Sequence, residues 1–397
     1  MEPIFVKDIK EILPEVVDWR RHFHQHPEPS YKEYNTTEYL IENIEKLGNV
    51  EVSRPMPTGL VARLKGIVPG PTIALRADID ALRMPELTGL GFASENAGVM
   101  HACGHDSHTA MLLGVLYVLS KNQASLNGEF VFIFQPAEEE QPGGAIELVK
   151  AGVMDGVDVV LGQHIDAMLP VGHIGVRTGP ASANSDGFEI VVTGQGGHAS
   201  APQLCLDPIP VAVQIVSALQ QIISREINPL EAAVLTVTRI NGGTANNIIP
   251  DTIAIGGTVR TYTKDNRDKI YKRIIEIANG ISTAGDCSVT VDYTWGYPSV
   301  VNTEVYVNNL NALANEIFGE GTATVIDPSM GGEDFAYYLE KVPGCFFHLG
   351  VRNEEKGCIY PQHNTKFMLD EDAFEMGITL LINGALRFQY VVDKKRK

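Results

Sequence analysis

A change of pattern near residue 183 constrains the fold of this chain more than any other feature of its sequence. Before it, short apolar segments at 72–75, 129–134 and 157–161 alternate with helical patterns, which predicts a parallel or mixed sheet covered by helices. After it, the patterns follow the order strand, helix, strand, strand, helix, strand, which is typical of a ferredoxin-like unit. A helix is again expected after Asn302-Thr303.

The chain is therefore expected to be an α/β protein of two domains. Its 397 residues exceed the size of one ordinary hydrophobic core. Residues 1–182 and 295–397 would form an outer αβ domain with a mixed sheet, and residues 183–294 an inserted ferredoxin-like α+β domain. The expected strands of the inserted domain lie at 188–192, 233–240, 252–260 and 288–293.

Helices are expected where apolar residues recur at helical spacing. The first would begin near Asn35-Thr36-Thr37, whose side chains are candidate N-caps, and end at Gly48. A second would begin near Asp106, and two more lie in the inserted domain, the earlier one after Asp207-Pro208. In chain order, the apolar residues that define these helices are Leu40, Ile44 and Leu47; Met111, Leu112, Val115, Leu116 and Leu119; Val213, Val216, Leu219 and Ile223; and Ile270, Ile274, Ile277 and Ile281.

Composition and charge exclude several classes of function. Lys and Arg total 31 and Asp and Glu total 49, so the formal net charge of −18 disfavours sequence-independent binding to nucleic acid. No run of about 18 apolar residues predicts a membrane span, and the first ten residues do not resemble a signal peptide. Five widely spread cysteines, an odd number, form no disulfide framework. We therefore expect a cytoplasmic protein without nucleic-acid or membrane partners.

Segment 101–108 concentrates the side chains that bind transition metals. Cys103 and His105 could reach one metal ion if Gly104 lets the backbone turn sharply. Asp106 could cap a helix or orient an imidazole. For His101 and His108 a structural role is favoured over a ligand role. The alternative to a metal site is a surface loop that happens to be rich in histidine.

Three consecutive carboxylates, Glu138, Glu139 and Glu140, directly follow a predicted strand. Near a metal, one carboxylate can be a ligand while its neighbour stays free as a base, although a solvated acidic turn is the alternative. His164, at another predicted strand end, and His363, near the C-terminus, are further candidates. A thiolate, three imidazoles and a carboxylate suit Zn, Mn, Co or Ni, and so many ligands indicate two metal ions.

Sequence patterns of other hydrolases and of nucleotide-binding proteins are missing. The chain contains no Walker A sequence, no G-x-S-x-G elbow and no H-E-x-x-H motif. Acyl transfer to serine and the use of ATP are therefore unsupported.

Five short motifs occur along the chain in a fixed order: RADIDAL at 76–82, HACGHD at 101–106, FQPAEE at 134–139, GGHA at 196–199 and GGEDF at 331–335. Together they resemble the amidohydrolase branch of the peptidase M20 superfamily of metallohydrolases. That branch includes N-acyl-amino-acid amidohydrolases, hippurate hydrolases and plant auxin-conjugate hydrolases. The resemblance extends over nearly the whole chain.

The resemblance implies a dinuclear metal site and assigns its residues. The implied ligands are Cys103, His105, Glu139, His164 and His363. The resemblance also implies that Glu138 is the general base, which deprotonates the water bound to the metal and later protonates the leaving amine. Asp80 matches a position that orients the metal site in the family, or it caps the end of a strand.

The same resemblance makes the inserted domain a lid and a dimerisation domain. His198 would stabilise the tetrahedral oxyanion or hold the substrate carboxylate, either in its own subunit or across a dimer. Asn246 and Arg260 would contact the substrate carboxylate. A homodimer through the inserted domain is expected, with a tetramer as the alternative.

The implied activity is hydrolysis of the amide bond of N-acyl-L-amino acids, which releases a carboxylate and a free amino acid. A metallo-dipeptidase or aminopeptidase on the same scaffold is the first alternative. A homologue that has lost activity is the second, and the intact set of ligand residues and base argues against it.

Overall fold

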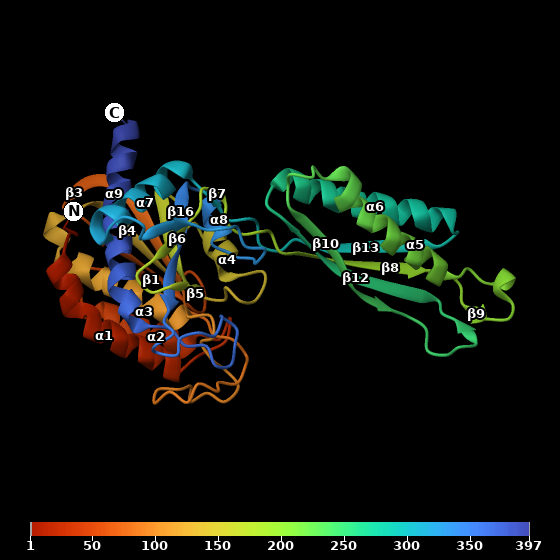
Figure 1. The fold of residues 1–397 in the computed structure, drawn as a ribbon, viewed down its shortest axis with the longest axis horizontal. Coiled ribbons are helices and arrows are strands. Elements are labelled where there is room, and N and C mark those ends of the chain that lie inside the picture. Colours follow the sequence, from red (N-terminus) through yellow and green to blue (C-terminus); the bar gives the residue numbers. More distant parts are fainter. Residues whose placement is uncertain (1, 397) are drawn as a thin grey trace. The chain divides into compact units, whose positions relative to one another are not determined.

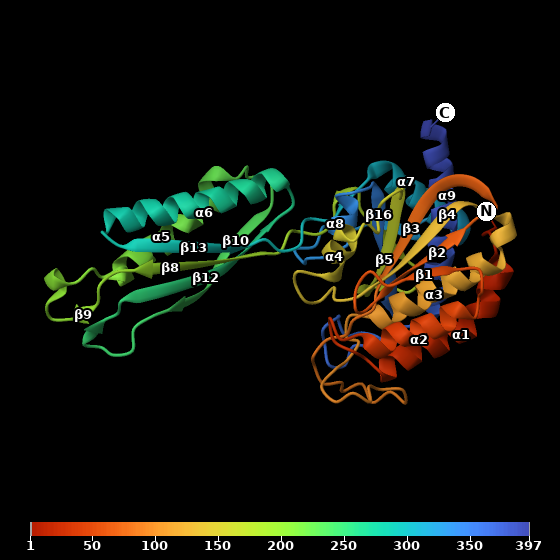
Figure 2. The same ribbon diagram turned by 180° about the vertical axis from the view of Figure 1, so that it is seen from behind.

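The computed structural model describes residues 2–396, and these form two compact units (Figures 1 and 2). The outer unit contains residues up to Ala181 together with Val301–Asp327 and the chain from Asp334 onward. The inserted unit contains Ser182–Val300 and Pro328–Glu333. The short segment 328–333, which the sequence analysis assigned to the outer domain, thus lies with the inserted unit. Within the described residues, no helix combines the length and apolar content needed to cross a membrane.

The outer unit is built on one eight-stranded sheet in the order β1-β2-β4-β3-β5-β16-β6-β15. The four central strands β4, β3, β5 and β16 run parallel, whereas β2 joins β4 and β6 joins β16 in antiparallel pairs, which confirms the mixed sheet. The strands are β1 Glu51–Ser53, β2 Leu60–Lys65, β3 Val68–Asp78, β4 Asn127–Gln135, β5 Val159–Pro170, β6 Ile174–Val176, β15 Ala323–Val325 and β16 Gly344–Arg352, with a small pair formed by β7 Gly179–Pro180 and β14 Val301–Asn302.

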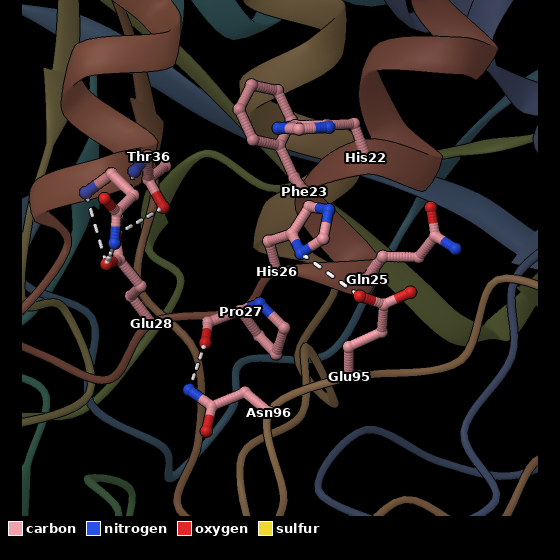
Figure 3. A pocket seen from close by; sticks show the side chains of 10 residues that line it. His22, Phe23, Gln25, His26, Pro27, Glu28, Thr36, Glu95 and Asn96 are labelled. Atoms are coloured by element: carbon pink, nitrogen blue, oxygen red, sulfur yellow. Dashed lines mark hydrogen bonds and ion pairs between the residues drawn. The ribbon is translucent and has the colours of Figure 1, made fainter.

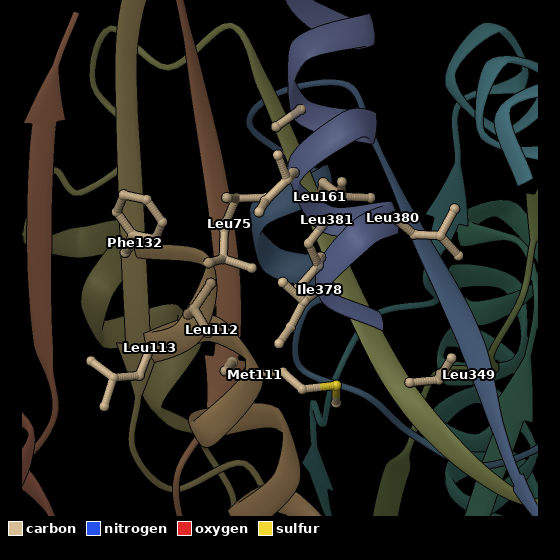
Figure 4. Close-up of a cluster of buried hydrophobic side chains, with 14 of the residues drawn as sticks. Leu75, Met111, Leu112, Leu113, Phe132, Leu161, Leu349, Ile378, Leu380 and Leu381 are labelled. Atoms are coloured by element: carbon tan, nitrogen blue, oxygen red, sulfur yellow. The ribbon is translucent and has the colours of Figure 1, made fainter. Parts of the chain in front are cut away.

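Two helices, α3 and α9, pack against the centre of this sheet (Figure 4). Met111 of α3 and Ile378 of α9 lie beside Leu75 of β3 and Leu161 of β5 in one continuous core. Because α3 is buried along almost its whole length, apolar residues surround it on all sides. The helices of the outer unit are α1 Val6–Gln25, α2 Tyr34–Glu45, α3 His105–Lys121, α4 Gly144–Lys150, α7 Glu304–Phe318, α8 Ala336–Leu339 and α9 Phe374–Arg396.

The N-terminal helices differ from the prediction in two ways. Helix α1 was not predicted, and α2 begins at Tyr34 after Glu33, so the proposed N-cap residues Asn35–Thr37 lie inside the helix. The carboxylate of Glu28 instead accepts hydrogen bonds from the backbone N–H groups of Asn35 and Thr36 at 3.2 and 2.8 Å. A carboxylate eight residues upstream thereby satisfies free N–H groups of the first turn.

The inserted unit has the predicted ferredoxin-like order. Its sheet runs β13-β8-β12-β10, every pair is antiparallel, and α5 and α6 cover one face (Figure 2). Val213 is exposed, contrary to the helical spacing proposed for α5, because Val211, Ile215 and Leu219 face the core. The elements are β8 Asp186–Thr193, β9 Gly197–His198, α5 Pro208–Gln221, β10 Ala233–Asn241, β11 Ile248–Ile249, β12 Thr252–Thr261, α6 Lys264–Ala284 and β13 Ser288–Thr294.

Candidate metal centre

The chemistry-bearing residues of the outer unit meet at the carboxyl ends of its parallel strands. β3 ends at Asp78, which pairs with Gln135, the last residue of β4. His164 lies in β5 two residues beyond Gly162, which pairs with Arg76. The sequence placed His164 after the end of its strand; this is wrong, because pairing with β16 carries β5 on to Pro170.

The structure brings the five implied ligands close to one another. Donor atoms of Cys103, His105 and Glu139 all lie within 4.8 Å of one another. The Sγ atom of Cys103 is 3.4 Å from Nε2 of His164, and Nε2 of His363 is 3.1 Å from Oε1 of Glu139. A tight turn makes this possible, because Gly104 has φ 88°, a left-handed conformation that favours glycine.

Asp80 orients His105. Both acceptors near Nδ1 of His105 belong to Asp80: the backbone oxygen at 3.0 Å and Oδ1 at 3.1 Å. In the neutral ring that a metal requires, Nδ1 must therefore carry the proton, which leaves the lone pair on Nε2. The other carboxylate oxygen of Asp80 accepts hydrogen bonds from Ser30 Oγ at 2.6 Å and from the backbone N–H of Glu139 at 3.0 Å. Asp80 thus fixes two of the candidate ligands.

These donors fit a transition-metal site. The Nε2 atom of His105 is buried and has no hydrogen-bond partner, as expected for a group whose partner is an ion. Thiol, imidazole and carboxylate donors together suit Zn, Mn, Co or Ni. Cys103, His105, Glu139, His164 and His363 are therefore the residues that could hold metal ions.

Without a metal, two of these donors keep their protons at neutral pH. Burial, and then the charges of Glu139 and Glu138, raise the pKa of the Cys103 thiol well above its usual value. Burial alone would lower the pKa of His105, but Asp78 and Asp80 outweigh it and raise this pKa to about 10. Metal binding must therefore displace protons from this centre.

Glu138 follows a strained residue beside the candidate ligands. Ala137 has φ 53°, a conformation that few non-glycine residues adopt, and its N–H donates to Oε1 of Glu33 at 2.8 Å. Burial, and then the charge of Asp80, raise the pKa of Glu33 to about 7. The turn leaves Glu138 buried, with its carboxylate within 4.8 Å of that of Asp334.

A buried network that was not predicted from the sequence lies behind the candidate ligands. The Arg76 guanidinium donates to Asp78 at 2.6 Å, to Gln135 at 2.8 Å and to Asp334 at 2.8 Å. Gln135 also donates to both carboxylate oxygens of Asp334 at 2.8 Å. The available signal was the alternation of Arg76 and Asp78 at the end of one strand, which places two charges on one face.

Asp106 neither caps α3 nor contacts an implied ligand through its side chain. The N-cap of α3 is Gly104. The Oδ2 atom of Asp106 lies 2.8 Å from Nδ1 of His24 and 2.8 Å from Nε of Arg20. Burial opposes ionisation, but Arg20 and His24 outweigh it and hold the pKa of Asp106 well below its usual value. Asp106 thus orients an imidazole, that of His24.

The three substrate-contact candidates lie in the inserted unit. His198, in β9, is exposed, and its Nδ1 accepts hydrogen bonds from the N–H and Oγ of Ser200 at 3.1 and 2.8 Å. Asn246 is exposed and precedes β11, in which Ile248 pairs with His198. Arg260 lies near the far end of β12 and donates to the backbone oxygen of Val259 at 3.0 Å. His198 and Asn246 are thus brought together, and Arg260 is not.

A separate pocket of about 540 Å³ lies beside the end of α1 (Figure 3). It contains His22 and His26, and Nδ1 of His26 is 3.9 Å from Oε2 of Glu95. No three donors in this pocket converge as a metal site among the residues that the structure describes. The side chains around Cys103 are therefore the stronger candidate.

Comparisons with known proteins show the family of this chain. The model of "Peptidase family M20/M25/M40" matches residues 74–386. The chain is 43% identical to thermostable carboxypeptidase 1 of Saccharolobus solfataricus over 93% of this chain and 94% of that protein. It is 45% identical to the N-acyl-L-amino acid amidohydrolase of Geobacillus stearothermophilus over 74% of this chain and 80% of that protein.

A solved structure with a related sequence shows the same fold. The Bacillus subtilis YXEP protein, described as a dinuclear metal-binding peptidase from the M20 family, superposes with a TM-score of 0.84 at 37% identity. The superposition covers 96% of this chain and 99% of that protein. The resemblance found in the sequence is thereby confirmed: this chain belongs to peptidase family M20/M25/M40, in its amidohydrolase branch, and is a metal-dependent hydrolase.

Proposed function

We propose that this protein hydrolyses the amide bond of N-acyl-L-amino acids, releasing a carboxylate and a free amino acid. The observation that carries this proposal is the convergence of Cys103, His105, Glu139, His164 and His363 beside the buried carboxylate of Glu138. The name of the Geobacillus relative, an N-acyl-L-amino acid amidohydrolase, supports the substrate class.

The five donors would hold two divalent ions, drawn from Mn, Zn, Co and Ni. When bound, such ions polarise an amide carbonyl and make a water molecule acidic enough to act near neutral pH. Glu138 accepts the proton of the attacking water on its carboxylate and returns it to the leaving nitrogen. Its buried position keeps bulk water from competing for that proton.

His198, Asn246 and Arg260 would bind the substrate from the inserted unit. β11 pairs with His198 just before β12 begins at Thr252, whereas Arg260 lies eight residues further along β12. At about 3.4 Å per residue, this places Arg260 about 27 Å from Thr252, the end of β12 that is nearer to His198. One small substrate cannot touch both in a single copy, so we propose that His198 and Asn246 act on the substrate bound by the partner subunit of a homodimer.

Exposed apolar residues of the inserted unit support a homodimer. Leu204, Leu206, Ile209 and Val213 are all more than a third exposed, and they lie on α5 or just before it. Such a cluster favours burial against a second copy. Sedimentation velocity would test this proposal, with a monomer as the contrary result and a tetramer as the alternative assembly.

Peptide cleavage is the second candidate. The relative named thermostable carboxypeptidase 1 aligns with nearly the whole chain, and a peptide bond next to a free carboxylate has the same amide chemistry. A dipeptidase or aminopeptidase, the alternative raised by the sequence, would need a pocket for a free α-amine.

A substrate panel separates these activities. Release of free amine from N-acyl-amino acids and dipeptides would be measured after chelation, with and without added Mn, Zn, Co or Ni. Metal-restored cleavage of one acyl class would support the amidohydrolase, whereas cleavage of dipeptides alone would support the peptidase. No cleavage by folded, metal-loaded protein would contradict both.

We also propose that the protein works in a reducing compartment such as the cytoplasm. All five cysteines, which lie within the described residues, are free thiols. Because Cys103 must remain reduced to bind metal as a thiolate, oxidising conditions would inactivate the centre.

A further inference from the structure

A buried imidazole beside the candidate ligands has both ring nitrogens engaged. His108 lies in α3 and is 1% exposed. Its Nδ1 is 2.6 Å from Oδ1 of Asp78, and its Nε2 is 2.9 Å from the backbone nitrogen of Ile165. A backbone N–H can only donate, so Nε2 accepts, and the single ring proton sits on Nδ1 and is donated to Asp78.

This assignment removes His108 from the set of metal ligands. Donor atoms of Asp78, His105, His108 and His164 lie within 4.8 Å of one another and could be mistaken for a metal site. However, neither nitrogen of His108 has a lone pair free to bind an ion. Asp78 and His108 are better described as a hydrogen-bonded support behind the candidate ligands His105 and His164.

The residue that His108 holds by its N–H also orients a candidate ligand through its carbonyl oxygen, on the next peptide group. The carbonyl oxygen of Ile165 accepts from Nδ1 of His164 at 2.7 Å and from Nε2 of Gln362 at 2.9 Å. Because that carbonyl can only accept, the proton of His164 lies on Nδ1 and the lone pair of Nε2 faces Cys103. Gln362 immediately precedes His363, so the same carbonyl also holds that loop.

On its other side, His108 is joined to the strand that precedes Glu138. Asp78, which accepts from His108, also accepts from Arg76 at 2.6 Å. Arg76 in turn donates to Gln135 at 2.8 Å, and Gln135 is three residues before Glu138. One chain of buried hydrogen bonds thus connects β4, β3, α3 and β5 behind the candidate metal centre.

We propose that His108 is a positioning residue, which holds the backbone of Ile165 and so sets the direction of His164 and the affinity of the metal ion that His164 would hold. This inference rests on the proposed two-metal function. Groups that orient a metal-binding histidine change metal affinity by about 10- to 100-fold when they are removed. His108 acts less directly, by holding the N–H of Ile165, whose carbonyl orients His164 and, through Gln362, the loop of His363.

Two substitutions distinguish the bonds of His108. In His108→Gln, the amide oxygen can reach the place of Nε2 and accept from Ile165. In His108→Asn, the shorter amide reaches only the place of Nδ1, so the bond to Asp78 can form but the bond to Ile165 is lost. We expect His108→Asn to weaken the binding of one of the two metal ions about 10- to 100-fold, and His108→Gln to weaken it much less.

The readout is cobalt binding, followed by the absorption of the cobalt–thiolate bond to Cys103 and by competition with a chromophoric chelator. His348→Gln is the matched control, because its ring lies 6.5 Å from that of His164 and Ile165 donates to His108 instead. We expect this control to bind both ions as the parent protein does. Near-ultraviolet circular dichroism of the metal-free variants shows whether each is folded.

Several results would overturn the proposal. Parent-like affinity for both ions in His108→Asn would do so, and so would equal losses in the Asn and Gln variants. If His108→Asn does not fold, ¹⁵N shifts of histidine-labelled parent protein decide the question, because a metal-bound or doubly protonated His108 is incompatible with the proposal. A parent protein that binds fewer than two ions would instead contradict the proposed two-metal function.

Discussion

The two units hold their functional side chains in opposite ways. In the outer unit, His105, Asp80 and Arg76 are buried, and hydrogen bonds fix the direction of each. In the inserted unit, His198 and Asn246 are exposed, and the His198 ring is bonded only to its neighbour Ser200. Metal chemistry needs donors that are fixed in advance, whereas residues that meet a substrate on closure can be ordered by binding itself.

A matched pair of salt bridges shows the same difference. Arg76 and Asp78 of the outer unit lie 2.6 Å apart and are fully buried. Arg239 and Glu189 of the inserted unit also lie 2.6 Å apart, but their side chains are 51% and 47% exposed. Equal distances therefore do not imply equal energies, since water screens only the second pair.

The largest expected effect is a loss of catalysis when Glu138, a buried residue of the outer unit, is changed. Glu138→Gln keeps the size of the side chain but removes the proton acceptor, so kcat should fall by up to about 10⁴-fold. Metal content and thermal unfolding should match the parent protein, because the implied ligands are intact. Steady-state kinetics with metal analysis of the same sample checks this, and near-parent kcat would remove Glu138 from its role.

The two arginines offer the next test. Arg76→Met leaves Asp78 and Asp334 buried without their cation, so we expect a loss of about 3–5 kcal/mol in the free energy of unfolding. Arg239→Met should cost less than about 1 kcal/mol, because its pair is exposed. Urea unfolding of both variants measures the difference. Similar losses in the free energy of unfolding would show that burial does not determine how much each salt bridge contributes.

Sequence reasoning predicted the fold where periodicity is local. The strands and helices of the inserted unit follow their hydrophobic spacing, and their order confirmed the ferredoxin-like sheet. Helix α1 was missed, and Pro14 lies inside it, where a proline is expected to end a helix. The length of β5 was missed because it depends on pairing with β16, which is distant in the chain.

The residues of the candidate site were likewise predicted only where the signal is local in the sequence. Cys103 and His105 were singled out because thiols and imidazoles that lie close in sequence already indicate metal binding. The hydrogen bond between Arg76 and Asp334 joins residues 258 positions apart, so no local sequence pattern predicts it. The role of His108 depends on which nitrogen carries a proton, and only the contact with the Ile165 amide reveals this.

A third test acts on the exposed side of the comparison. His198→Ala should lower kcat/KM by about 100- to 1000-fold, because it removes one group that would stabilise the oxyanion. The free energy of unfolding should change by less than about 0.5 kcal/mol, since the ring is exposed and makes few contacts. Kinetics and urea unfolding check the two parts.

Mixing variants extends this test to the proposed dimer. If His198 acts across subunits, a hybrid of His198→Ala and Glu138→Gln contains one site with both residues intact, so exchanged mixtures should regain activity. If His198 acts in its own subunit, every site in the hybrid lacks one of the two residues. Mixtures that exchange subunits and remain inactive would contradict action across the dimer.

The smallest effect is a pH dependence that only the buried centre should show. Without metal, burial and then the charges of Glu139 and Glu138 raise the pKa of Cys103. Burial alone would lower the pKa of His105, but Asp78 and Asp80 outweigh it and raise this pKa to about 10. Both donors therefore carry protons at pH 7 and must lose them when metal binds. Metal affinity should then rise with pH between neutrality and about pH 10, and fall on acidification.

Calorimetry at pH 7 in buffers of different ionisation enthalpy measures the released protons. His198→Ala should release as many as the parent, because its exposed ring lies outside the set of implied ligands, and metal binding without proton release would contradict the shifted pKa values.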